Sequence, residues 1–338
     1  MMIRERCLDA AYSQNELAEV SSTMSNNNDI ELSNSDDCEK YINQFIQEVP
    51  LRRAEIGQGT VIKRALPSRH KRMIGAWCFL DHAGPTQFPQ GDGLDIGPHP
   101  HIGLQTFTWM IEGTMMHSDS LGNRQLIRPK QVNLMTSGYG ISHTEVSPET
   151  ETKMHAAQLW IALPDDKINM APAFDHYPEL PVIEEQGIQC TVLVGELLNT
   201  QSPVKVHTEL LGVDLFAAES TRARLSLDPR FEYGFMALEG LASINGHELT
   251  EDNMVILEPG LQHVDVEIHA GGRILLIGGE PFESPILLWW NLVGRDVEEL
   301  KLAREQWMMG HPRFGTIPSY DGPRMEAPAF PEHMRASR

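Results

Sequence analysis

The sequence predicts an all-β protein built from two stacked antiparallel β-barrels, with a few short helices. Between residues 52 and 279 the chain consists of short apolar or alternating runs separated by Gly, Pro, Asn and Asp, as expected for the strands and turns of a sandwich or barrel. Strands and helices do not alternate in the βαβ manner that would predict a parallel sheet. The 338 residues exceed one ordinary domain, and one pattern recurs in the second half.

The first 48 residues are expected to form a disordered acidic tail. They are rich in Ser, Asn, Asp and Glu and contain few aromatic residues. Such a segment cannot bury enough apolar surface to offset the entropy lost on ordering. A short helix could form around residues 38–47, where Tyr41, Ile42 and Phe45 recur at helical spacing.

An internal echo indicates that one small barrel occurs twice. The run at residues 109–113 resembles the run at 236–240, and residues 132–135 resemble residues 254–257. In each case a glycine and then a histidine follow the second run. Two copies of one barrel would explain both the echo and the length of the chain.

We expect the first barrel within residues 49–172 and the second within residues 173–290. The second copy has no counterpart of the paired histidines found in the first. It keeps only His263 and Asp265, which amount to half of a metal site at most. Metal binding is therefore expected in the first barrel alone.

Residues 291–338 are expected to form a helix and a Pro-rich end. Asp296 can cap the first helical turn, and Glu299, three residues later, can complete a capping box. An apolar stripe then continues at helical spacing through Val297, Leu300, Ala303 and Trp307. The chain beyond His311 is predicted to be an extended strap or a frayed tail.

Composition argues against several classes of function. A formal charge of −20 leaves no basic face for nucleic acid or for an anionic membrane. The start of the chain lacks an apolar export signal, and the longest apolar run, residues 286–290, is too short to span a bilayer. We therefore expect a cytoplasmic protein. Its four scattered cysteines form no Cys-x-x-Cys pair, which indicates reduced thiols rather than disulfides or thiolate metal ligands.

Two short segments carry the residues from which a function can be inferred. Pro98-His99-Pro100-His101 and His143-Thr144-Glu145 each follow a Gly-rich turn. Alternate side chains of a strand share a face, so each segment directs two candidate ligands the same way. A single histidine in a strand is more often packed or solvated, but three imidazoles and a carboxylate together suit a mid-row transition metal. Non-haem Fe(II) oxygenases use two histidines and one carboxylate with open positions.

The chain resembles the pirin family of the cupin superfamily. The resemblance rests on the spacing Gly93-x5-His99-x-His101, on the run GPHPHIGLQTFTWMIEG, and on HSDSLGNRQLI, NLMTSGYGISHTE and AAQLWIALP. It extends over about residues 52–295 and implies a bicupin of two jelly-roll barrels. By this resemblance His99, His101, His143 and Glu145 are the ligands of one divalent transition metal. Fe(II) is the favoured ion, with Ni, Mn, Co, Cu or Zn as alternatives.

The resemblance implies quercetin 2,3-dioxygenase-type activity, in which dioxygen cleaves a flavonol or a similar aromatic enol. Glu145 could then be both a ligand and the general base that accepts the proton of the substrate hydroxyl. The alternative is a non-enzymatic, iron-dependent redox sensor that binds a transcription factor or a metabolic enzyme. Because one fold hosts many chemistries, a reaction on another small molecule is a third alternative.

Further residues are expected around the site. Gln105 stands where ordinary cupins have a glutamate ligand, and its neutral amide could orient a ligand or a substrate. If the strand continues unbroken from the paired histidines, Gln105, Phe107 and Trp109 share their face, and the two rings would form an apolar wall. Core packing is an equally good explanation of the rings. His117 and His155 could hold a ligand ring by its outer nitrogen, or could simply be packed.

Overall fold

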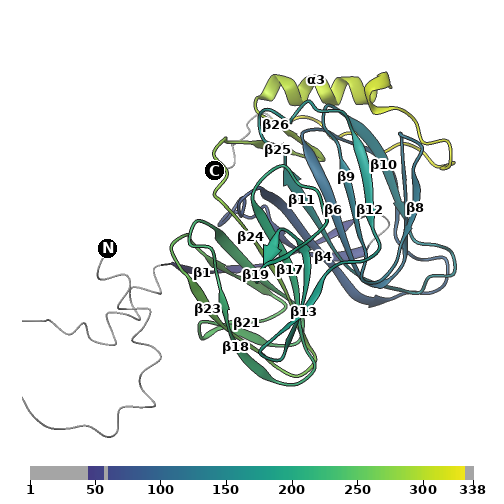
Figure 1. Cartoon of the computed structure of the whole chain (residues 1–338). Helices are drawn as coiled ribbons and strands as arrows, with labels where there is room; N and C mark the ends of the chain where they lie inside the picture. Colours follow the sequence, from purple (N-terminus) through teal and green to yellow (C-terminus); the bar gives the residue numbers. More distant parts are fainter. Residues whose placement is uncertain (1–44, 57–59, 332–338) are drawn as a thin grey trace, which may run out of the picture. The chain divides into compact units, whose positions relative to one another are not determined.

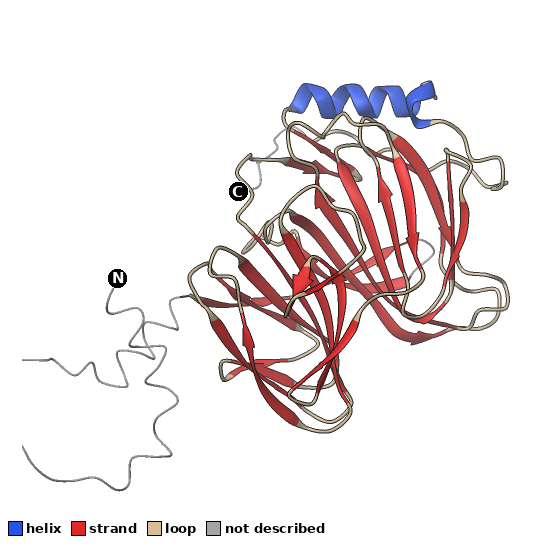
Figure 2. Cartoon of the chain, viewed as in Figure 1, coloured by secondary structure: helices blue, strands red, loops and turns tan. Residues whose placement is uncertain are grey.

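The computed structural model describes residues 45–56 and 60–331, whose regular secondary structure is almost entirely β-strand (Figures 1 and 2). The described part contains one α-helix and one 3-10 turn, fewer helices than expected. The tail predicted over residues 1–48 and the helix predicted around 38–47 lie largely outside this part. The last residues of the predicted tail instead belong to strand β1 (Ile46–Pro50). Within the described ranges, no helix has the length and apolar character needed to cross a bilayer.

The first barrel combines a seven-stranded and a four-stranded antiparallel sheet. The larger sheet has the order β12-β9-β6-β11-β4-β3-β2 and the smaller one the order β5-β10-β7-β8. The strands are β2 (Arg52–Ile56), β3 (Thr60–Leu66), β4 (Trp77–Gln87), β5 (Asp95–His101), β6 (Leu104–Gly113), β7 (Met115–Asp119), β8 (Arg124–Ile127), β9 (Val132–Thr136), β10 (Ile141–Val146), β11 (Lys153–Ala162) and β12 (Ala173–Tyr177). Although β12 lies beyond the boundary expected at residue 172, it pairs with β9. The first barrel therefore extends further than predicted.

The second barrel is again a seven-stranded sheet with a four-stranded one. Their orders are β1-β22-β19-β24-β17-β14-β13 and β18-β23-β20-β21. The strands after β1 are β13 (Val182–Glu185), β14 (Ile188–Val194), β17 (Leu210–Ala217), β18 (Thr221–Ser226), β19 (Glu232–Glu239), β20 (Ala242–Ile244), β21 (His247–Leu249), β22 (Asn253–Leu257), β23 (His263–Ile268) and β24 (Gly272–Gly279). Two small hairpins complete the strands, β15 (Glu196–Leu197) with β16 (Thr200–Gln201), and β25 (Leu287–Trp289) with β26 (Leu292–Gly294).

The two barrels repeat one strand order, which confirms the prediction of a duplicated barrel. Strands β6 and β9 take the places in the first large sheet that β19 and β22 take in the second. In the small sheets β10, with His143, corresponds to β23, with His263. Strand β5 carries His99 and His101, whereas its counterpart β18 has the sequence TRARLS. The second barrel thus lacks the paired histidines because a different sequence occupies the equivalent strand.

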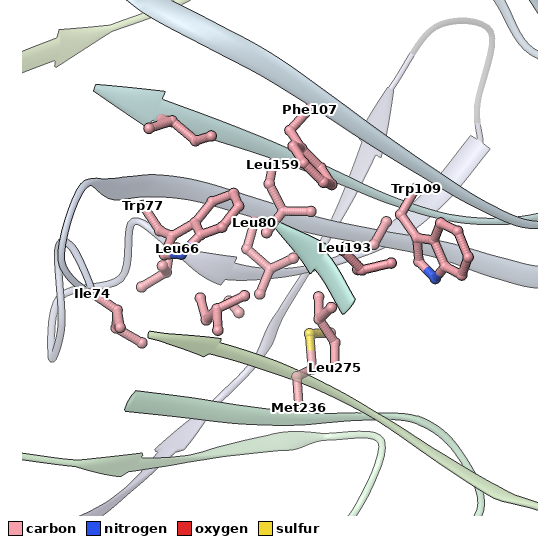
Figure 3. Close-up of a cluster of buried hydrophobic side chains, with 14 of the residues drawn as sticks. Leu66, Ile74, Trp77, Leu80, Phe107, Trp109, Leu159, Leu193, Met236 and Leu275 are labelled. Carbon is pink, nitrogen blue, oxygen red and sulfur yellow. The ribbon is translucent and has the colours of Figure 1, made fainter. Parts of the chain in front are cut away.

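A shared hydrophobic core joins the large sheets of the two barrels. Figure 3 shows this cluster of buried side chains, to which Phe107 of the first barrel and Leu275 of the second both belong. Trp77 lies in the same cluster, and its indole Nε1 donates hydrogen bonds to the carbonyl oxygens of Leu211 and Gly278, both at 3.2 Å. The large ring buries apolar surface while its one polar atom finds partners in the other barrel. Trp77 therefore ties the two barrels together.

The predicted C-terminal helix is present as α3 (Val297–Met308), followed by a 3-10 turn (Pro312–Phe314). The side chain of Asp296 accepts a hydrogen bond from the backbone N–H of Glu299 at 2.8 Å, as an N-cap does. The carboxylate of Glu299 accepts from the backbone N–H of Arg295, one residue before the position that a capping box uses. The buried positions of the helix are Leu300, Ala303 and Trp307, which belong to the predicted stripe.

Candidate metal centre

Strands β5 and β10 bring three histidines together in the first barrel. The strands pair antiparallel, with His143 directly opposite His99 and Ile141 opposite His101. One nitrogen from each of the three imidazoles lies within 4.8 Å of the other two, and all three residues are buried. Across residues 45–56 and 60–331 this is the one group of three or more such side chains close enough to hold a metal ion. The structure thus unites the three histidines that the sequence singled out.

Burial keeps these imidazoles neutral. It lowers the pKa of His99 to about 4 and the pKa values of His101 and His143 well below the ordinary range, and neighbouring imidazoles lower the latter two further. A metal ion needs the lone pair of a neutral ring, because a protonated ring has none to offer. At neutral pH all three side chains are therefore in the form that can bind a cation.

Backbone carbonyls orient two of the three rings. His99 Nδ1 lies 2.9 Å from the carbonyl oxygen of Gly97, and His101 Nδ1 lies 2.9 Å from that of Asn291. A carbonyl can only accept, so each Nδ1 carries the proton and each Nε2 carries the free lone pair. The Nε2 atoms of His101 and His143 are 3.1 Å apart. Two facing lone pairs at this distance repel each other unless a cation or a proton lies between them.

His117 and Asp119 on β7 orient the third ring. His117 Nδ1 lies 3.3 Å from His143 Nδ1, and His117 Nε2 lies 3.1 Å from Asp119 Oδ2. Burial alone would raise the pKa of Asp119, but hydrogen bonds from His117 and Asn123 together hold it below its usual value. The ionised carboxylate accepts from His117 Nε2–H, so His117 Nδ1 accepts from His143 Nδ1–H. His143 Nε2 is then left unprotonated toward the other two rings.

Glu145 faces the same cavity but is not part of the group of three. Its Oε1 accepts a hydrogen bond from Gln158 Nε2 at 3.1 Å, and Gln158 Oε1 accepts from the Thr108 hydroxyl at 2.6 Å. Burial raises the pKa of Glu145 to about 7, against the opposing effect of the hydrogen bond from Gln158. The pairing of β10 with β5 shifts register between His143 and Glu145. The extra residue of this shift lies in β5, between Ile96 and His99, and β10 pairs with β7 without a shift, so alternation along β10 still directs His143 and Glu145 to the same face.

His99, His101 and Glu145 line a cavity of about 590 Å³, which is within the range of small-molecule sites. One wall carries Phe79 and Trp160, whose rings stack with centroids 3.9 Å apart and planes 11° apart. The rings of His101 and Trp160 are nearly perpendicular, with centroids 5.2 Å apart and planes 77° apart.

An ion pair lines another part of the same cavity. Arg64 donates two hydrogen bonds of 2.6 Å to Asp81, and its guanidinium lies 4.5 Å from the centre of the Phe79 ring. The cavity therefore offers a flat aromatic surface next to polar and charged groups, as a planar polar ligand would need.

Comparison with known proteins identifies the family. The model of the pirin family matches residues 59–161, and that of the pirin C-terminal cupin domain matches residues 212–315. A pirin-like protein from Caulobacter vibrioides is 34% identical over 267 residues, which cover 77% of this chain and 91% of that protein. The chain belongs to the pirin family.

Other relatives carry names that refer to a reaction or a ligand. A Pseudomonas aeruginosa protein, provisionally named a quercetin 2,3-dioxygenase, is 50% identical over 301 residues, 89% of this pirin and 96% of that protein. A crystal structure of quercetin 2,3-dioxygenase from Acinetobacter baumannii is 70% identical, covers 88% of this chain and 100% of its own, and has a TM-score of 0.87. A bacterial pirin from Escherichia coli, in complex with nickel(II), shares the fold at 20% identity, with a TM-score of 0.55 over 70% of this chain and 99% of its own.

Gln105, Phe107 and Trp109 do not line the cavity of this pirin. The chain turns at Gly103, where φ is +70°, and the next strand, β6, belongs to the other sheet. Thr108 consequently faces the cavity, whereas Phe107 and Trp109 point into the core between the barrels. The amide of Gln105 is buried and donates a hydrogen bond to a threonine hydroxyl on β9 at 2.9 Å. The prediction that these three share the face of the histidines was wrong because the strand is broken.

His155 also faces away from the cavity. Its neighbours on β11, Met154 and Ala156, line the cavity, so the alternation of the strand directs His155 to the opposite face. There its Nε2 lies 2.8 Å from Nε2 of His82, and its Nδ1 lies 3.0 Å from a carboxylate oxygen of Glu239 in the second barrel. The predicted contact with a candidate ligand is therefore wrong for His155, which instead joins the two barrels. For His117 the structure does show such a contact.

Several groups at the site were not singled out from the sequence. Asp119 lies two residues after His117 in one strand, so alternation alone could have identified it. Gln158 and Trp160 have the same spacing in β11, within the segment AAQLWIALP. The Asn291 carbonyl that orients His101 lies 190 residues further along the chain, and no local pattern indicates it.

Proposed function

We propose that this pirin is a metal-dependent dioxygenase that cleaves a flavonol or a similar planar aromatic enol in the manner of quercetin 2,3-dioxygenases. The observation that carries the proposal is the convergence of three neutral, buried imidazoles beside a cavity with a stacked aromatic wall. The names of the similar proteins from Pseudomonas and Acinetobacter point to the same reaction. They also favour it over the redox-dependent partner considered above.

The residues present fit a divalent transition metal. His99, His101 and His143 would hold it through nitrogens whose opposite ring atoms are each hydrogen-bonded outward. Glu145 in the same cavity would supply the fourth, anionic ligand. Fe(II) is our favoured ion, and nickel(II), which the Escherichia coli pirin binds, is a practical probe. When bound, the metal would hold a substrate hydroxyl oxygen and lower the pKa of that hydroxyl.

When Glu145 is detached from the metal, its carboxylate would accept the proton that the substrate hydroxyl gives up. A carboxyl group with a pKa of about 7 can be a base or an acid near neutral pH, which suits reversible proton transfer. The amide of Gln158 donates to one of its oxygens and would keep the carboxylate aligned. Thr108 fixes that amide from the other side, because its hydroxyl donates to the amide oxygen.

The aromatic wall would bind the flat ring system of the substrate. Phe79 already covers Trp160, and the Arg64 guanidinium lies near the Phe79 ring. Stacking of aromatic rings contributes about 0.5–1.5 kcal/mol beyond the area that they bury. The wall would therefore orient a planar substrate as well as exclude water.

Anaerobic reconstitution tests the proposed function. Metal-free protein is loaded with Fe(II), mixed with quercetin and exposed to dioxygen, while the visible absorbance of quercetin and released carbon monoxide are followed. We expect consumption of quercetin by the native chain and by a control variant, His269→Ala, whose exposed residue lies in the second barrel. Consumption should be lost in His101→Ala. No consumption with Fe, Ni, Mn, Co or Cu would contradict the proposal and leave redox-dependent partner binding as the function to test.

A further inference from the structure

Residues 316–331, here called the C-terminal strap, lie beyond both family matches. The strap contains no helix or strand, yet it is held firmly against the first barrel and α3. Ile317 and Ala327 are buried. The indole Nε1 of Trp307 on α3 donates a hydrogen bond to the carbonyl oxygen of Met325 at 2.8 Å. A segment with such contacts is a built part of the fold rather than a frayed end.

The strap contacts β5 along the residues that precede His99. The Tyr320 hydroxyl donates a hydrogen bond to Asp95 Oδ1 at 2.9 Å, and the backbone N–H of Met325 donates to the carbonyl oxygen of Pro98 at 2.9 Å. Between these two points the strap packs on Gly97, where an added Cβ would come within 3.0 Å of the strap backbone. A side chain there would require the strap or β5 to shift by a few tenths of an ångström. The strap therefore fixes both ends of the short segment 95–98.

The same backbone orients a candidate ligand. The carbonyl oxygen of Gly97, against which the strap packs, accepts the hydrogen bond from His99 Nδ1. Met325, whose backbone N–H donates to β5, also lines the cavity. A displacement of the strap would thus change the position of the Gly97 carbonyl and the cavity wall together.

We propose that the C-terminal strap is a positioning element of β5: it holds residues 95–98 in place and thereby sets the ring of His99. Tyr320 is a positioning residue in this arrangement. That His99 is a metal ligand rests on the proposed function. The attachment of the strap to residues 95–98 of β5, here called the tether, does not. Because coupling between two sites is reciprocal, a cation bound by the histidines must also stabilise the strap.

Hydrogen exchange in the metal-free, full-length protein tests the tether. Tyr320→Phe removes one hydroxyl and keeps the ring. We expect exchange about fivefold faster in residues 95–101 and in the strap, since couplings of this size are typical. The matched control is Tyr177→Phe, which removes a hydroxyl that accepts a 3.1 Å hydrogen bond from the backbone of Lys205; it should leave residues 95–101 unchanged. Unaltered exchange of these residues in Tyr320→Phe would overturn the proposal, whether or not the protein binds metal.

Calorimetric titration with Ni(II) tests the link to the histidines. We expect affinity about fivefold weaker in Tyr320→Phe than in the native chain and unchanged in Tyr177→Phe. Ni(II) should slow exchange of the strap in the native chain but not in His101→Ala. Equal affinity in Tyr320→Phe and the native chain would overturn the link to His99. If the native chain takes up no Ni(II), the proposed metal centre fails, and the exchange of residues 95–101 alone decides the tether.

Discussion

Replacement of His117 by Phe would test whether the ring behind His143 prepares it for a cation. His117 links Asp119 to His143 through contacts of 3.1 Å and 3.3 Å. It is buried and stacks on Phe174, with centroids 4.3 Å apart and planes 13° apart. A phenyl ring preserves this stacking. The substitution therefore removes the acceptor for His143 Nδ1–H and one donor to Asp119, and little else.

The expected loss can be worked out from these contacts. Removing the outer partner of a histidine ligand typically weakens metal binding about 10–100-fold, which corresponds to about 1.4–2.8 kcal/mol. The metal-free protein should also lose about 1–3 kcal/mol of unfolding free energy, because a buried N–H of His143 is left without an acceptor. Asp119 keeps its hydrogen bonds from Asn123 and from the backbone of Leu121, which limits the damage on that side.

The assay is calorimetric titration of metal-free protein with Ni(II), well below the unfolding temperature of each variant. The matched control is His176→Phe, the same exchange in the same barrel, where Nδ1 contacts Asn133 at 2.7 Å rather than a candidate ligand. We expect weaker Ni(II) binding in His117→Phe and native affinity in His176→Phe. Native affinity in His117→Phe would refute the inference that this ring sets the tautomer of His143.

Three other predictions concern the Glu145 carboxylate, its hydrogen-bond partner Gln158 and the hydrophobic core between the barrels. The native pKa of Glu145 is about 7, above its unfolded value near 4.5, so the stability that its proton adds is complete below pH 4.5 and is lost as the pH rises to 7. Relative to the native chain, the free energy of unfolding of metal-free Glu145→Gln should therefore rise by about 3 kcal/mol between pH 4.5 and 7. Denaturant titrations in which the stabilities of the two proteins change in parallel over this pH range would contradict the prediction. Gln158→Leu removes the hydrogen-bond donor that lowers the pKa of Glu145, and it should therefore shift the acidic limb of the pH profile of kcat/KM to higher pH. An acidic limb at the native pH would count against the role of the hydrogen bond between Gln158 and Glu145. Trp109→Phe deprives buried Asp214 of a 2.9 Å hydrogen bond and should cost about 1.5–3 kcal/mol of unfolding free energy in a denaturant titration. Its Ni(II) affinity should stay native, and a fall would show that the core between the barrels is coupled to the site.

The fold could be predicted largely from local patterns. Alternation and turn residues define strands over four to eight positions, and the echo between residues 109–113 and 236–240 reveals strands with the same place in two equivalent sheets. Asp296 predicted the start of α3 because a cap acts within one turn. The limit of the first barrel was misplaced because the pairing of β12 with β9 is a contact between distant segments.

Only those features of the site that follow from strand alternation could be predicted from the sequence. His99 and His101 are two residues apart in one strand, so their common face follows from geometry alone. Alternation fails at Gly103, where one left-handed residue sends the chain into another sheet and turns Phe107 toward the core. Backbone carbonyls such as that of Asn291 have no side-chain signature, so no pattern could show that it orients His101.

The metal content of single-histidine variants tests the proposed metal centre most directly. Metal-free proteins are incubated with Ni(II), desalted and analysed for nickel per chain. We predict one equivalent in the native chain and in His263→Ala, the counterpart of His143 in the second barrel, and far less than one in His99→Ala, His101→Ala and His143→Ala. A full equivalent retained by all three of these variants, or an equal loss from His263→Ala, would contradict a metal centre built on β5 and β10.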